Sequence, residues 1–287
     1  MSRSLALDAV VACLTGPEPD DGNGAGASWS ATTLALEGGA VFGGQLLGQA
    51  VAIAAKLDPS MVAKSVSAVF PRSVRDTGSL RYAVSCLHRG AAYATQRLDI
   101  AQPDRAGQSV TACSATVIVH RPVDGLAHQQ PMSSAAGSPD DARPVDLGIV
   151  PWTCRIVGDT DLDARGAQPN ELLLWTRVDE ALGDEPHVHQ ALLAYISDLT
   201  LIGTALLAHD GWSQLDAHRA LRTSVIAHQL WFHRPFRIDD WLLLRQTSPA
   251  ASAGSAFGTG EVHTRAGELV ASFAQEAMIR LPEEGDR

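Results

Sequence analysis

The chain has 287 residues, a length that suits one large domain or two of ordinary size. Apolar residues make up 45 % of it and charged residues 19 %, a balance typical of a globular protein with a sizeable core. The formal net charge of −10 argues against nucleic acid as a partner, because such binding needs surplus Lys and Arg on one face.

The first predicted element is an amphipathic helix in the apolar run LALDAVVACL, Leu5 to Leu14. The run is short, contains Asp8 and precedes no small-residue cleavage site, so it does not suit a signal peptide. The next segment, Gly16 to Ser28, consists mostly of turn-forming residues and is expected to be a loop.

A helix and several strands complete the first half. Gly43 to Leu57 opens with two glycines and is rich in Ala, which predicts a helix. Alternating side chains over Val110 to Val119 are typical of a strand. We assign residues 1–120 to an N-terminal half. Residues 121–146 are rich in Pro, Ser, Gly and Asp and predict a linker, which leaves 147–287 as a C-terminal half.

The second half opens with an apolar run of 18 residues from Ala191 to Ala208. That length is the lower edge for crossing a bilayer. Asp198 sits near the centre of the run, where a carboxylate would cost about 2.5 to 3.5 kcal/mol on insertion. We therefore expect one long, buried core helix and no membrane partner.

The two halves repeat one pattern of helix followed by strands. Phe70 and Arg72 precede Phe232 and Arg234 by 162 residues, and other matched positions keep nearly the same interval. Such repetition indicates duplication of one α+β module. We expect each half to wrap an antiparallel sheet around a long central helix.

Function in a duplicated fold is expected where the halves differ. Helix two carries Asp198, and the last strand carries Gln275 where the first half has Ala115. A buried carboxylate must be paired or neutral, and one beside an amide can hold and polarise a water molecule as a general base. The alternative is that Asp198 only braces a neighbouring strand, as acids in structural networks do.

Four segments resemble the acyl-CoA thioesterase II family: VFGGQLLGQA, HQALLAYISDLTLI, WFHRPFRIDDWLL and GELVASFAQEAMIR. The resemblance runs from about Val41 to Arg280 and covers both halves in order. It implies an α+β tandem (double) hotdog fold. It also implies an enzyme that hydrolyses acyl-CoA to free acid and coenzyme A, with acyl-CoA as the partner and no cofactor.

In that family an Asp on the second helix, a Thr or Ser on the middle strand and a Gln on the last strand hold the hydrolytic water. Asp198 matches the first position and Gln275 the third, whereas the second falls on Val225, which has no hydroxyl. Thr223 shares the face of Val225 in an ideal strand, and a bulge could re-aim Ser224. These two residues are therefore candidates for the missing hydroxyl.

Candidate substrate contacts come from both halves. The bare backbone N–H groups of Gly43 and Gly44 open a helix and could polarise a thioester carbonyl, although a tight packing turn explains them equally well. Trp231 and Phe232 are expected in the core and in the wall of the acyl pocket.

Two other functions stay open. The absence of a hydroxyl at Val225 is also what an acyl-CoA-binding protein with weak or lost hydrolysis would show. The segment GDEPHVH places Asp184 and His189 five residues apart, as in a hotdog enoyl-CoA hydratase motif, but without its Asn-Pro step. Hotdog sheets leave edges that pair, so we expect a homo-oligomer, a dimer or higher.

The four cysteines, Cys13, Cys86, Cys113 and Cys154, lie 27 or more residues apart. No CxxC pair exists, so neither a zinc nor a redox motif is expected, and the site should hold no metal. Reduced thiols of this kind predict a cytoplasmic protein.

Overall fold

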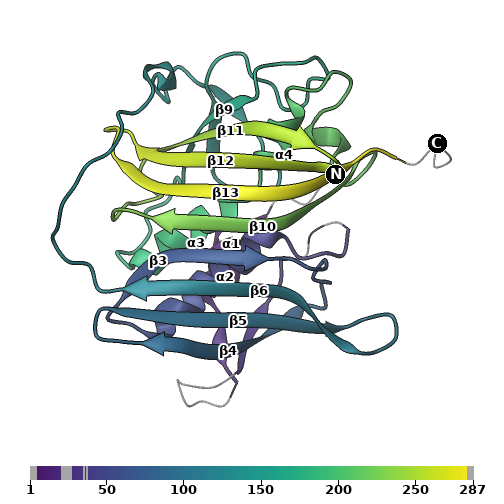
Figure 1. Cartoon of the computed structure of the whole chain (residues 1–287). Helices are drawn as coiled ribbons and strands as arrows, with labels where there is room; N and C mark the ends of the chain where they lie inside the picture. Colours follow the sequence, from purple (N-terminus) through teal and green to yellow (C-terminus); the bar gives the residue numbers. More distant parts are fainter. Residues whose placement is uncertain (1–4, 21–27, 35, 37, 283–287) are drawn as a thin grey trace.

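The computed structural model describes residues 5–20, 28–34, 36 and 38–282 (Figure 1). Its helices are α1 Leu7–Thr15, α2 Gly43–Leu57, α3 Pro186–Ser197 and α4 Leu201–Leu206, with short 3-10 turns η1 Ser134–Ala136 and η2 Gln214–Asp216. Strands of the first half are β1 Glu18–Pro19, β2 Ser28–Thr32, β3 Val62–Val69, β4 Ser79–Arg89, β5 Tyr93–Pro103 and β6 Ser109–His120. Those of the second are β7 Arg143–Val145, β8 Thr153–Ile156, β9 Glu171–Arg177, β10 Arg222–Phe232, β11 Leu242–Ser252, β12 Ser255–Thr264 and β13 Leu269–Arg280.

These strands form one sheet of 13 strands in the order β1-β2-β4-β5-β6-β3-β10-β13-β12-β11-β9-β8-β7. The order within one half is mirrored in the other, and the halves meet where β3 pairs with β10. Figure 1 shows the first half in purple and blue and the second in green and yellow, with α1, α2 and α3 behind the sheet. The expected architecture, two α+β halves with helices wrapped by antiparallel strands, is confirmed.

The register at the seam follows the sequence repeat. Ser67 lies opposite Gln229, and these two positions are 162 residues apart, the interval found between the halves. On either side, Val69 faces Ala227 and Ser65 faces Trp231, which exchange under the same shift. The two modules are therefore joined through equivalent strands around a local twofold axis.

The helices α2 and α3 pack together inside the sheet. Nearly all of α2 from Gly44 onward is buried, and so is α3 from His189 to Ser197. A Cβ added to Gly48 would lie 2.9 Å from the backbone oxygen of Ala191, so a glycine at this crossing lets the two backbones approach closely.

Three segments differ from expectation. Part of the expected loop after α1 forms β1, which pairs with β2, and residues 21–27 of that loop lie outside the described residues. The last residues of the expected linker form β7, which pairs with β8 and covers an otherwise open sheet edge. The long helix expected over 191–208 is broken between α3 and α4. In the described part of the chain, no helix has both the length and the apolar composition needed to cross a bilayer.

Candidate active site

The break between α3 and α4 places Asp198 at the end of α3. The hydroxyl of Ser197 donates to the backbone oxygen of Ala194 at 3.0 Å, and the hydroxyl of Thr200 pairs with the side-chain amide of Gln246 on β11. Side chains that bond to the backbone or to a neighbouring strand compete with helical continuation. This explains why three consecutive turns of apolar sequence do not form one helix.

The carboxylate of Asp198 is buried, with 4 % of the residue exposed. Nε2 of Gln275, on β13, donates to Oδ1 of Asp198 at 2.7 Å and also approaches its backbone oxygen at 3.4 Å. Burial raises the pKa of Asp198 from 3.8 to about 7, while hydrogen bonds from Gln275 and the backbone N–H of Gly44 act in the opposite direction. A carboxyl group with a pKa near neutrality is suited to take up and return a proton.

The first turn of α2 closes over this carboxylate. A Cβ added to Gly43 would lie 2.6 Å from Oδ2 of Asp198, and one added to Gly44 would lie 2.2 Å from the backbone oxygen of Tyr195. Only glycine fits at such distances. The structure thus brings both glycines to Asp198, and it directs the N–H of Gly44 at the carboxylate. The start of a helix in one half therefore supports the acid of the other.

His228 is a member of the site that sequence reasoning missed. It lies opposite Gln275 in the pairing of β10 with β13, is completely buried and stacks on Phe273 with ring centroids 5.9 Å apart. Its Nε2 lies 3.0 Å from the hydroxyl of Ser197, and its Nδ1 lies 3.5 Å from Oδ1 of Asp198 without hydrogen-bond geometry. Burial lowers the pKa of His228 to about 3, so its ring is neutral.

Two acceptor atoms next to Asp198 are free. Among the described residues, neither Oε1 of Gln275 nor Nδ1 of His228 has a hydrogen-bond partner, and both atoms are buried. Native structures leave few buried polar atoms in this state, because each costs roughly 1 to 3 kcal/mol. Unsatisfied acceptors on two neighbouring strands beside one acid indicate a site that binds a small hydrogen-bond donor such as water.

The candidate hydroxyls lie elsewhere on β10. A bulge between Val225 and Ala227 separates the first turn of the strand from His228. The Thr223 hydroxyl accepts from the backbone N–H of His218 at 2.9 Å and lies 3.1 Å from its Nδ1. The Ser224 hydroxyl donates to the backbone oxygen of Val225 at 3.3 Å. The structure therefore brings Asp198 and Gln275 together but places these two hydroxyls in other contacts.

Val225 itself is part of an apolar cluster. It packs against Ile202 and Leu206 of α4 and against Ala277, its partner on β13. A valine suits this environment, because a hydroxyl among apolar side chains would need a partner of its own. The segment after the helix break thus continues as core beside the polar site.

The other predicted substrate contacts separate to the two faces of β10. Phe232 is buried and stacks on Phe236 with centroids 6.2 Å apart, and both line a cavity of about 920 Å³. Trp231 points to the opposite face and is 39 % exposed. The cavity also contains His189 and Gln190 at the start of α3.

This cavity and the acid do not coincide. His189 lies nine residues before Asp198, which is roughly 13 Å along a helix. We place the catalytic site at Asp198, because the raised pKa, the glycine turn and the two unpartnered acceptors converge there. The cavity lies at the opposite end of the helix pair.

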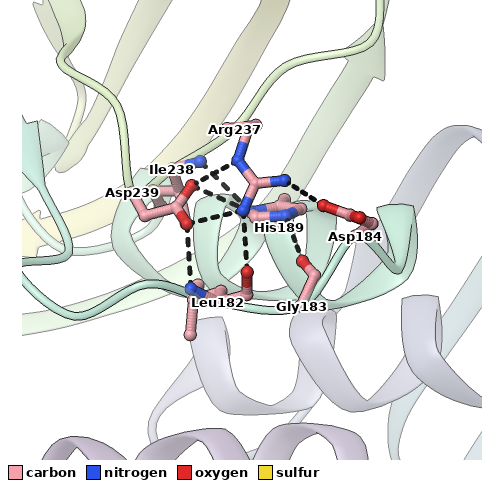
Figure 2. A network of polar contacts seen from close by, with 7 residues as sticks. All are labelled: Leu182, Gly183, Asp184, His189, Arg237, Ile238 and Asp239. Carbon is pink, nitrogen blue, oxygen red and sulfur yellow. Dashed lines mark hydrogen bonds and ion pairs between the residues drawn. The ribbon is translucent and has the colours of Figure 1, made fainter.

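The residues of the hydratase-like segment form a brace at the rim of that cavity (Figure 2). Arg237 bonds to the exposed carboxylate of Asp184 at 2.6 Å. The ring of His189 is buried, with Nε2 3.0 Å from the Gly183 oxygen and Nδ1 accepting from the Ile238 N–H at 3.3 Å. Both ring nitrogens are engaged by backbone, so this pair does not support hydration chemistry.

No three His, Cys, Asp or Glu side chains are grouped to hold a metal ion within the described residues. The four cysteines are free thiols, with Cys86 exposed and the others buried.

Comparison with known proteins gives one consistent result. Residues 161–278 match the family model described as acyl-CoA thioesterase. The chain is 27 % identical to mouse acyl-coenzyme A thioesterase 8 over 265 residues, which cover 84 % of this chain and 80 % of that protein. It is 27 % identical to acyl-CoA thioesterase 2 of Haemophilus influenzae over 263 residues, with 85 % and 88 % covered.

Solved structures agree. An acyl-CoA thioesterase II from Mycobacterium marinum superimposes with a TM-score of 0.78 at 29 % identity, covering 95 % of this chain and 99 % of that one. A protein with a hot dog fold from Alicyclobacillus acidocaldarius superimposes with a TM-score of 0.71 at 15 % identity, covering 95 % and 98 %. The tandem hotdog expected from the repeated module is thereby confirmed.

Proposed function

Because this chain belongs to the acyl-CoA thioesterase II family, we propose that it hydrolyses acyl-CoA thioesters to a free acid and coenzyme A. The observation that carries the proposal is the buried Asp198 carboxyl, with a pKa near 7 and a hydrogen bond from Gln275. An acid that titrates near neutral pH at the junction of both halves suits a base that activates water.

In the proposed reaction, the Asp198 carboxylate removes one proton from a water molecule as the water oxygen bonds to the thioester carbonyl carbon. The tetrahedral adduct then breaks its carbon–sulfur bond. The proton held by Asp198 passes to the sulfur, so that coenzyme A leaves as a thiol. A thiol has an ordinary pKa of about 8.5, above that of Asp198, so this return of the proton is downhill.

Gln275 has a positioning role in this scheme. Its amide N–H holds one carboxylate oxygen of Asp198 and so directs the other oxygen. The start of α2 adds a second contribution, since the partial positive charge at a helix N-terminus favours the negative charge that develops on the thioester oxygen. Gly43 and Gly44 supply this helix start beside the acid.

Phe232 is proposed as a wall residue for the acyl chain, on the basis of its place in the 920 Å³ cavity. We also expect the protein to form a homo-oligomer. Support comes from exposed apolar side chains at the seam, Val69 on β3 and Ile226 and Trp231 on β10. Light scattering after size-exclusion chromatography measures the mass directly. The free thiols support a reducing, cytoplasmic location.

One observation favours a second candidate, an acyl-CoA-binding protein without turnover. Val225 packs as an apolar core residue at the position where the resemblance expects a hydroxyl. The neighbouring hydroxyls of Thr223 and Ser224 have other partners. A site that has lost one hydrogen bond to water could still bind the thioester.

Release of free coenzyme A from a series of acyl-CoAs tests both candidates, with Asp198→Asn beside the native protein. Loss of the base is expected to reduce kcat by about 100- to 10,000-fold. Full turnover in Asp198→Asn would show that another group is the base. Binding of acyl-CoA by the native protein without turnover at any chain length would support the binding protein.

A further inference from the structure

The bulge in β10 has a consequence for the site, because it determines which side chain of this strand faces Asp198. Before the bulge, Thr223 and Val225 lie opposite Ile279 and Ala277. After the bulge, the register advances by one residue and His228 lies opposite Gln275. The inserted residue thus turns an imidazole, rather than Ala227, toward the helix break.

The protonation of the imidazole follows from its partner. The single hydroxyl proton of Ser197 is donated to the backbone oxygen of Ala194 at 3.0 Å. The Ser197 oxygen can then only accept from the imidazole, so Nε2 of His228, 3.0 Å away, carries the ring proton. In a neutral ring the other nitrogen is an acceptor. Nδ1 therefore presents a lone pair 3.5 Å from Oδ1 of Asp198.

An attacking water needs two acceptors. One of its protons goes to the base, and the second must be held so that the oxygen lone pair points at the thioester carbon. Hydrogen bonds of water are about 2.8 Å long, so one water molecule can contact two atoms that are 3.5 Å apart. Val225 has no acceptor atom to offer.

We propose that Nδ1 of His228 accepts the second hydrogen bond of the attacking water, in place of the hydroxyl that Val225 lacks. This inference rests on the proposed thioesterase function. It makes His228 a catalytic residue, since it contacts the reacting water, and gives Ser197 a positioning role through the tautomer. The low pKa of the ring, caused by burial, keeps it an acceptor throughout the working pH range.

The surroundings of the ring agree with this role. The groups that face it are Ser197 and Asp198 from the helix break and Gln275 and Phe273 from β13. Phe273 holds the ring plane by stacking. Asp198 is the titratable member of this set besides the ring, so proton uptake and hydrogen-bond acceptance are divided between two groups.

Two substitutions at this position separate the roles of the two ring nitrogens. His228→Asn keeps a polar atom at the position of Nδ1, two bonds from Cβ, and removes the Nε2 contact with Ser197. His228→Gln keeps a polar atom at the position of Nε2 and removes the acceptor near Asp198. A residue that acts only as a brace through Ser197 would tolerate Gln better than Asn. A water ligand would tolerate Asn better than Gln.

We therefore expect kcat to fall by about 10- to 100-fold in His228→Gln, with KM changed by less than about threefold, whereas His228→Asn stays within about fivefold. Adding Val225→Thr to His228→Gln should restore at least part of kcat, because it returns a hydroxyl acceptor. The matched control is His263→Gln, since His263 is also buried with an unpartnered Nδ1 but lies on β12 opposite Leu243 and Leu269. It should change kcat by less than about threefold.

Kinetics are measured as coenzyme A release, and thermal unfolding reports folding of each variant. Equal kcat in His228→Gln and the native enzyme, or a larger loss in Asn than in Gln, would overturn the inference while leaving Asp198-dependent hydrolysis intact. If His228→Gln does not fold, Val225→Thr alone decides. A gain of more than about tenfold would mean that the native site lacks an acceptor, and little change supports His228. Absence of hydrolysis in the native enzyme overturns the proposed function and this inference together.

Discussion

Nε2 of Gln275 lies 2.7 Å from Oδ1 of Asp198, although the two residues are 77 positions apart in the chain. The contact connects the break between α3 and α4 with the last strand of the sheet. It is also one of the two hydrogen bonds that oppose the effect of burial on the Asp198 pKa. Geometry and acidity at the proposed site are therefore determined by the same side chain.

The first prediction concerns the pH dependence of hydrolysis. Only the carboxylate form of Asp198 can take a proton from water, and burial raises its pKa to about 7. The rate should therefore rise about tenfold per pH unit below 7 and level off above about 8. A profile of kcat between pH 5 and 9 measures it. A rate that is constant from pH 5 upward would exclude Asp198 as the titrating base.

The second prediction concerns the Gln275 amide. Gln275→Ala removes a donor that stabilises the carboxylate, so the midpoint of the pH profile should move to higher pH and kcat should fall by about 10- to 100-fold. Gln96→Ala is a matched control, because Gln96 is equally buried and donates to Asp58 at 2.8 Å in the other half. The control should lose stability without moving the midpoint.

The third prediction concerns stability. The pKa of Asp198 is raised on folding, so the folded protein binds more protons than the unfolded chain between pH 4 and 7, and stability falls as pH rises through that window. A shift of about 3 pKa units corresponds to roughly 4 kcal/mol. Asp198→Asn cannot ionise. Its free energy of unfolding, relative to the native protein, should therefore be more favourable at pH 8 than at pH 4. Denaturant unfolding at both pH values tests this, and an unchanged difference would contradict it.

The fourth prediction concerns the first turn of α2. A methyl group at Gly44 would lie 2.2 Å from the Tyr195 oxygen and 2.5 Å from the Phe42 ring, so Gly44→Ala must push the helices apart. We expect a loss of about 3 kcal/mol or more and a loss of activity, because the same turn contacts Asp198. Gly166→Ala is the control, since a Cβ there meets no atom within 4 Å. Wild-type stability in Gly44→Ala would show that this packing is wrong.

Much of the fold could be predicted from residue patterns. The helix Gly43–Leu57 begins and ends where the Ala-rich run predicts it. The 162-residue interval recurs in the pairing of Ser67 with Gln229. Periodicity and repetition are local or pairwise properties of a sequence, so they are visible without coordinates. The same comparison of halves singled out Asp198 and Gln275, because a buried polar residue stands out against an apolar pattern.

What only the tertiary structure decided lies within a few ångströms of that acid. The helix break at Asp198 depends on the contact of Thr200 with Gln246 on another strand. The inward turn of His228 depends on a bulge, and one inserted residue reverses every side chain that follows it. A linear sequence shows which polar side chains are buried. It does not show which of them meet, because hydrogen bonds act over about 3 Å and that distance is determined by packing between elements far apart in the chain.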